Sequence, residues 1–259
     1  EQLKLLEIVV DETAGRVPIL AGAAEPNIDQ VLEVAQRASE LGCRAISVTG
    51  PYYYSVSQES IECYFTEIAK HTPIDMLLYN IPAFANEISL PVLERLALNN
   101  KKIVGVKDSS GDLTRLMHCM NRIKAKRPDF STLVGWEGIF IPAMLMGADG
   151  GALSSAGVVP EIYVKMMKAF NEGNFTESKE IQLCVLDLFQ TMLEATNFPE
   201  GFREGYAIRG FNPGRARMRL SASEETAMGG VRLEIAKILS DFGYSNAKSI
   251  YRKYQEKTC

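Results

Sequence analysis

Histidine is scarce in this chain: His71 and His118 are the only two among 259 residues. His71 closes a predicted helix and His118 lies within another, so both positions are typical of surface or capping residues. A zinc centre of the usual kind and a Ser-His-Asp triad both use histidine. Because no histidine ends a predicted strand, neither kind of site is expected.

The sequence also lacks paired cysteines and long apolar runs. Its cysteines are odd in number, scattered and never in a CxxC pair, which predicts reduced thiols rather than disulfides or a zinc site; they are Cys43, Cys63, Cys119, Cys184 and Cys259. No apolar stretch approaches the roughly 18 residues of a membrane-spanning helix, and no signal peptide opens the sequence. We therefore expect a cytoplasmic protein without membrane contact.

An excess of basic charge and phosphate-binding glycine motifs are missing as well. Lys and Arg number 28 against 32 Asp and Glu, and the formal net charge is -4. This balance, without a basic cluster, argues against a nucleic-acid partner. Neither GxGxxG nor GxxxxGK(S/T) occurs, which argues against a nucleotide site, and no cofactor is expected. What is present is apolar sequence, 46% of the residues, enough for a large core.

Short β-rich apolar runs recur about every 28 residues, with a sixth following sooner, and segments of helical periodicity lie between them. The predicted strands are Val17–Gly22, Ala45–Thr49, Met76–Ile81, Ile103–Lys107, Thr132–Gly135 and Gly150–Ser155. Helices are predicted over residues 27–42, 57–71, 89–98 and 112–126. Asn27 is the expected N-cap of the first and Gly42 its C-terminal stop.

Apolar strands that alternate with helices predict a parallel sheet covered by helices. An open doubly wound sheet and a closed (β/α)8 TIM barrel both have this pattern. The even spacing, the polar residues at strand ends and the missing nucleotide fingerprint favour the barrel.

Only six strands can be counted, and residues 1–10 read as the middle of a helix. A barrel needs eight, so we expect about 40 further residues with two strands before this sequence. We assign residues 1–172 to the barrel and 173–259 to a C-terminal helical region. In that region Ser221 and Glu224 match a capping box, and a polar tail ends the chain.

Lys107 is the main candidate for chemistry. It ends the fourth predicted strand and Tyr79 ends the third, so the two occupy equivalent positions on neighbouring strands. Functional groups of a barrel gather at the carboxyl ends of its strands, where a lysine can form a Schiff base with a carbonyl substrate. Tyr79 would then transfer protons, and Gly105 would leave space for the lysine. A solvated lysine and a packed tyrosine are the structural alternatives.

Several motifs together resemble the dihydrodipicolinate synthase / N-acetylneuraminate lyase family. They are Pro51-Tyr52-Tyr53, Tyr79-Asn80-Ile81-Pro82, Gly105-Val106-Lys107-Asp108, Gly111-Asp112 and Gly147-Ala148-Asp149-Gly150-Gly151. The resemblance implies a (β/α)8 barrel with C-terminal helices and, usually, a homotetramer. It also implies a class I lyase or aldolase that forms a lysine Schiff base with pyruvate or another 2-oxo acid. It makes Lys107 the Schiff-base residue, Tyr79 the proton-relay tyrosine and Tyr53 the tyrosine that completes the relay in a neighbouring subunit.

Departures from the family pattern bear on the substrate. Synthases of the family carry an arginine where this chain has Phe84, sialic acid lyases carry a second acidic residue where it has Gly138, and the family's Gly-Thr-Thr-Gly-Glu segment is absent. An apolar Phe84 favours a sugar-derived 2-keto-3-deoxy acid. The alternatives are dihydrodipicolinate synthase itself, a 2-keto-3-deoxy acid dehydratase, and a non-catalytic barrel that only holds a 2-oxo acid. The candidate substrate-binding residues are Phe84, Gly135, Glu137, Ala152 and Ser154.

Overall fold

The computed structural model describes residues 1–258, with side chains described as far as Arg252. The chain divides into two compact units, Glu1–Ala152 and Leu153–Cys259. In the first unit six strands form one sheet, and their order in the sheet is their order along the chain. Every pairing is parallel, as the alternation of strands and helices predicts.

The central strands agree with the sequence prediction to within one residue at each end. The strands are β1 (Leu20–Gly22), β2 (Ala45–Thr49), β3 (Asp75–Asn80), β4 (Ile103–Asp108), β5 (Ser131–Val134) and β6 (Gly150–Gly151). The prediction is wrong at both edges of the sheet, where β1 and β6 are shorter than expected. Each edge strand bonds to a single neighbour in the described sheet, so fewer ladder hydrogen bonds hold its backbone extended.

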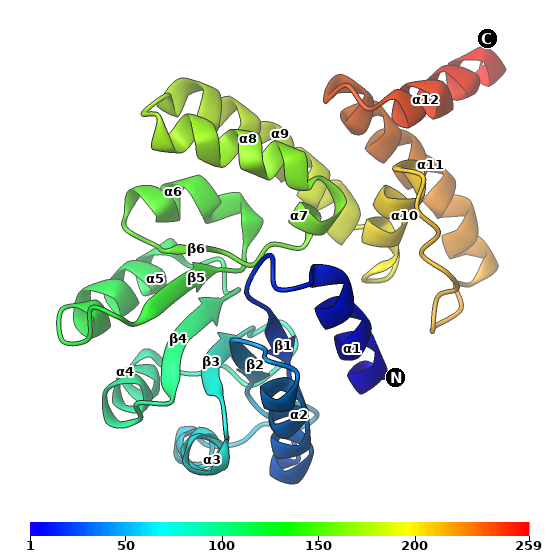
Figure 1. Cartoon of the computed structure of the whole chain (residues 1–259). Helices are drawn as coiled ribbons and strands as arrows, with labels where there is room; N and C mark the ends of the chain where they lie inside the picture. The colour runs from blue at the N-terminus through cyan, green and yellow to red at the C-terminus, as the bar shows by residue number, and fades with distance from the viewer. Residues whose placement is uncertain (259) are drawn as a thin grey trace. The chain divides into compact units, whose positions relative to one another are not determined.

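Helices α2 to α5 follow successive strands and lie along one face of the curved sheet (Figure 1). The helices of this unit are α1 (Gln2–Thr13), α2 (Ile28–Glu40), α3 (Gln58–His71), α4 (Leu90–Asn99), α5 (Leu113–Cys119) with a π-helical turn (Met120–Lys124), and α6 (Phe140–Leu145) after a 3-10 turn (Glu137–Ile139). The predicted cap of α2 is confirmed: Asn27 accepts a hydrogen bond from the backbone N–H of Asp29. Gly42 follows that helix with φ +76°, a conformation that favours glycine.

The core of this unit lies between the sheet and these helices, because alternate strand residues point to opposite faces. Ile46, Val48, Met76, Leu78 and Val106 face the helices and are fully buried. Each such side chain stabilises the fold by about 1.5–3 kcal/mol. The strand residues that alternate with these, among them Thr49, Tyr79 and Lys107, point to the other face of the sheet.

The second unit is helical, as predicted. Its helices are α7 (Ser155–Val158), α8 (Pro160–Asn171), α9 (Phe175–Leu193), α10 (Glu200–Ile208), α11 (Ala222–Asp241) and α12 (Ser245–Thr258). The capping box at Ser221 and Glu224 is confirmed. The polar tail expected at the end of the chain is instead helix α12, and Ser155, expected in a strand, opens α7.

Cys43, Cys63, Cys119 and Cys184 are free thiols, in agreement with the sequence prediction, and Cys259 lies outside the described residues. Burial raises the pKa of the Cys119 thiol to about 12, so it remains protonated at neutral pH. Among the described residues, no helix combines the length and apolarity needed to cross a membrane. The same part of the chain holds no cluster of His, Cys, Asp and Glu suited to a metal ion.

Candidate active site

Lys107 and Tyr79 meet at the carboxyl ends of two adjacent strands. Each is the next-to-last residue of its strand, and the β3–β4 register pairs them directly. The Lys107 Nζ lies 4.0 Å from the centroid of the Tyr79 ring. Both residues are half-buried. The strand register thus places an amine and a phenol within reach of the same small molecule.

Gly135 provides the space that the lysine side chain occupies. A Cβ at Gly135 would collide with the Ser109 hydroxyl and lie 3.0 Å from the Lys107 Cε. Gly105 has a different role from the one expected, because a Cβ there would come 2.6 Å from the carbonyl oxygen of Ser131 on the neighbouring strand. Gly105 therefore allows close approach of β5, and Gly135 leaves room for the Ser109 hydroxyl and the Lys107 side chain.

The residues that follow Tyr79 and Lys107 point to the opposite face, toward the helices. Asn80 is fully buried and donates a hydrogen bond to the Asp108 carboxylate at 3.0 Å. The Arg115 guanidinium, on α5, pairs with the same carboxylate at 2.9 Å. The side chains of Asp108 and Arg115 are only 5% and 9% exposed, so this is a buried ion pair.

The same network also holds the loop that follows β3. Asn80 Oδ1 accepts a hydrogen bond from the backbone N–H of Ile88, and Arg115 donates to the Ile88 carbonyl oxygen at 2.5 Å. The Asp108 carboxylate further accepts from the backbone N–H of Ser110. The network of Asn80, Asp108 and Arg115 therefore holds the ends of β3 and β4 and the loops beyond them. It lies on the face of the sheet opposite to Lys107 and Tyr79.

Tyr53 lies in an irregular loop after β2 and is almost fully exposed, at 96%. Its φ is +86°, in the left-handed region that a bulky residue rarely adopts. Such a conformation costs about 1–3 kcal/mol and persists only where the surroundings impose it. Tyr52 and Tyr54 are exposed beside it, and strained exposed residues of this kind are often functional.

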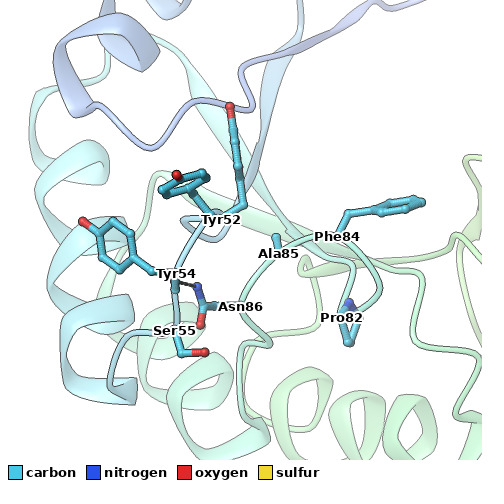
Figure 2. A pocket seen from close by; sticks show the side chains of 8 residues that line it. Tyr52, Tyr54, Ser55, Pro82, Phe84, Ala85 and Asn86 are labelled. Carbon is cyan, nitrogen blue, oxygen red and sulfur yellow. Dashed lines mark hydrogen bonds between the residues drawn. The ribbon is translucent and has the colours of Figure 1, made fainter. Parts of the chain in front are cut away.

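An open hollow of about 270 Å³ lies between the tyrosine loop and the loop after β3. It is lined by Tyr52, Tyr53, Tyr54, Ser55, Pro82, Phe84, Ala85 and Asn86. Figure 2 shows the Phe84 and Tyr54 rings extending in opposite directions, with Asn86 between the two loops. Phe84 is 58% exposed, so the position presents an apolar ring at the loop surface.

The remaining predicted site residues lie in different surroundings. Glu137 is fully buried and begins the 3-10 turn after β5. Ala152 is the last residue of the first unit, and its backbone N–H donates to the Val134 carbonyl oxygen at 2.9 Å. Ser154 belongs to the second unit, where it precedes α7. Thr49, the register partner of Tyr79, has a buried hydroxyl without a hydrogen-bond partner in the described structure.

The fold and the site together define a parallel α/β protein with a lysine at the carboxyl end of a strand. Comparison with known proteins identifies its family. The model of the Dihydrodipicolinate synthetase family matches residues 1–237. The chain belongs to this family, as its motifs predict. The probable 2-dehydro-3-deoxy-D-pentonate aldolase YjhH of Escherichia coli K12 is 32% identical over 189 residues, which are 73% of this chain and 63% of that relative.

Two further relatives cover more of the chain. The 4-hydroxy-tetrahydrodipicolinate synthase of Thermoanaerobacter sp. X514 is 30% identical over 245 residues, or 94% of this chain and 80% of the relative. The crystal structure of YagE, a prophage protein of E. coli K12 solved in complex with pyruvate, has a TM-score of 0.83 at 23% identity. That match covers 92% of this chain and 80% of YagE, and it shows that the fold is shared.

Proposed function

We propose that the protein is a class I lyase or aldolase that makes or breaks a carbon–carbon bond through a Schiff base on Lys107. The observation that carries this proposal is the Lys107 amine 4.0 Å from the Tyr79 ring at the ends of adjacent strands. Aldolases and synthases among the relatives support it. The proposed substrates are pyruvate and a 2-keto-3-deoxy sugar acid, and the proposed location is the cytoplasm.

The proposed chemistry begins when the Lys107 amine attacks the ketone carbon, a proton is taken up and water leaves, which forms an iminium. In the cleavage direction the electron pair of the C3–C4 bond moves into the iminium, and the C4 hydroxyl gives up its proton. Tyr79 takes that proton in the proposed relay, which Tyr53 of a neighbouring subunit completes. Protonation of the resulting enamine and hydrolysis of the imine release pyruvate and free Lys107.

The proposed substrate contacts are Phe84, Gly135, Glu137, Ala152 and Ser154. Gly135 has the clearest geometric support, since it borders Lys107.

Phe84 leads to a prediction about specificity: we expect little or no condensation of pyruvate with aspartate semialdehyde. An aromatic ring cannot form the charge-assisted pair with a substrate carboxylate that an arginine would form. That pair contributes about 1.5–3 kcal/mol, or about ten- to a hundredfold in rate. A coupled synthase assay tests this, with Phe84→Arg as the variant expected to gain activity. Efficient condensation by the unaltered protein would contradict the prediction.

Tyr53 leads to a second prediction: the protein is an oligomer, expected to be a tetramer, with Tyr53 at a subunit contact. The support is the cluster of exposed aromatic side chains around it, because tyrosine is enriched at interfaces. Light scattering at micromolar concentration should give four times the mass of the chain. A monomer under these conditions would refute the prediction.

We also propose that the six strands are part of a closed (β/α)8 barrel, to which residues 1–172 contribute an incomplete portion, and that residues 173–259 form the helical region. The sequential order of six parallel strands supports this, because each strand of such a barrel pairs with its neighbours along the chain. The family resemblance supports it as well.

The proposed function is tested by incubating the protein with a panel of 2-keto-3-deoxy sugar acids and measuring pyruvate release with lactate dehydrogenase. At least one of these acids should be cleaved with stoichiometric formation of an aldehyde. A protein that forms the imine but cleaves none of them would instead be a barrel that only binds 2-oxo acids.

A further inference from the structure

Asn86 joins the loop that carries Tyr53 to the loop that carries Phe84. Its side-chain N–H group donates to the carbonyl oxygens of Pro51 and Tyr54, at 2.7 and 2.8 Å. Its side-chain oxygen accepts from the backbone N–H of Val56 at 3.1 Å, and its own backbone N–H donates to Pro51 at 3.0 Å. Figure 2 shows the bond from Asn86 to Tyr54.

These hydrogen bonds hold the backbone both before Tyr53, at Pro51, and after it, at Tyr54 and Val56. Within the described chain, the backbone of residues 51–56 makes hydrogen bonds to other parts of the chain only through Asn86. The two loops are also in close contact at Gly50, where a Cβ would lie 2.7 Å from the Asn86 carbonyl oxygen. The left-handed backbone of Tyr53 therefore lies in a segment that is tied to the rest of the chain through Asn86, by its amide side chain and by its backbone N–H.

We propose that Asn86 is a positioning residue, which holds Tyr53 in its left-handed conformation and fixes it relative to the Phe84 loop. This inference rests on the proposed function, in which Tyr53 completes the proton relay. Asn86 acts through Tyr53, because it holds the backbone of the tyrosine loop from both sides of that residue. The same side chain couples the two loops that line the hollow.

Asn86→Ala removes all three side-chain hydrogen bonds. Asn86→Asp is isosteric, keeps the acceptor for Val56 and replaces the donors to Pro51 and Tyr54 with a carboxylate oxygen. Gln58→Ala is the matched control. Gln58, the first residue of α3, bonds the carbonyl oxygen of Glu87 and the backbone N–H of Ser89, so it holds the segment that follows Asn86 without touching residues 51–56.

We expect Asn86→Ala and Asn86→Asp to lower kcat about tenfold, a fraction of the hundredfold or more that a general acid-base residue contributes, with KM within about twofold. Gln58→Ala should change neither value by more than about twofold. In a Tyr53→Phe background Asn86→Ala should cost no more than about twofold further, because residues that act through one group are not additive.

Hydrogen–deuterium exchange of the peptide covering residues 50–57 gives a readout that does not depend on activity. Exchange should be faster in Asn86→Ala than in Gln58→Ala, since the Val56 amide loses its acceptor. Unchanged exchange, or an equal loss of kcat with and without the Tyr53 hydroxyl, would overturn the inference. Trapping of a pyruvate imine on Lys107 in the unaltered protein and in Asn86→Ala separates this failure from a failure of the proposed function.

Discussion

Replacing Lys107 with methionine is expected to abolish pyruvate release, with a loss of kcat on the order of 10⁴-fold or more, because the covalent route loses its nucleophile. Methionine retains the unbranched apolar side chain that lies over Tyr79, so the fold should survive. The measurement is the lactate dehydrogenase assay on the best 2-keto-3-deoxy acid of the panel.

Lys102→Met is the matched control for this prediction. Lys102 lies just before the other end of the same strand, where its ammonium group donates to the Pro73 carbonyl oxygen at 3.2 Å. Its replacement should leave kcat within about twofold of the unaltered protein, as for a surface position away from the site. If Lys107→Met retained more than a few per cent of the activity, the Schiff-base mechanism would be wrong.

Arg115→Met should destabilise the protein by about 3–5 kcal/mol, since it leaves the Asp108 carboxylate buried without its positive partner. The ion pair is 2.9 Å long, and neither side chain is more than 9% exposed. Urea unfolding followed by circular dichroism measures this change. Adding Asp108→Asn to Arg115→Met should recover part of the loss, because the double variant no longer buries an unpaired charge.

The Arg95–Glu62 pair provides the comparison. It is 2.7 Å long and bidentate, with bonds to both carboxylate oxygens, yet the two side chains are 49% and 29% exposed. Arg95→Met should therefore cost at most about 1 kcal/mol, as exposed pairs do. Equal losses for Arg95→Met and Arg115→Met would show that burial does not set the strength of the Asp108 pair.

The central strands could be predicted from their apolar runs. The helices between them could be predicted from their apolar periodicity and from N-cap residues such as Asn27. The positions of Tyr79 and Lys107 at the ends of neighbouring strands could be predicted from the equal spacing of the strands in the sequence. The parallel register of β3 and β4 then brings the two residues side by side. The lengths of the edge strands were overestimated. Their sequences resemble strands, but hydrogen bonding to a neighbour on one side only does not keep the whole predicted segment extended. Helix α12 was missed because its sequence is predominantly polar.

The supporting residues of the site could not be predicted from the sequence. Asn86 contacts Val56 and Pro51, 30 and 35 residues away, and Arg115 contacts Ile88, 27 residues away, as well as the nearer Asp108. Polar residues in a helix or loop carry no signal in the sequence for such distant partners. Gly135 was a candidate through its place at the end of a predicted strand and through the family resemblance. Its physical role, leaving room for Lys107, depends on side-chain positions that only the three-dimensional structure gives.

Reduction with sodium borohydride in the presence of pyruvate tests the central claim most directly. The imine on Lys107 should be reduced to a stable secondary amine, and peptide mass spectrometry should find the added mass on the peptide that contains Lys107. The adduct should be absent from Lys107→Met and present in Lys102→Met. A folded protein that gains no adduct, or gains it on a different lysine, would contradict the assignment of Lys107 as the Schiff-base residue.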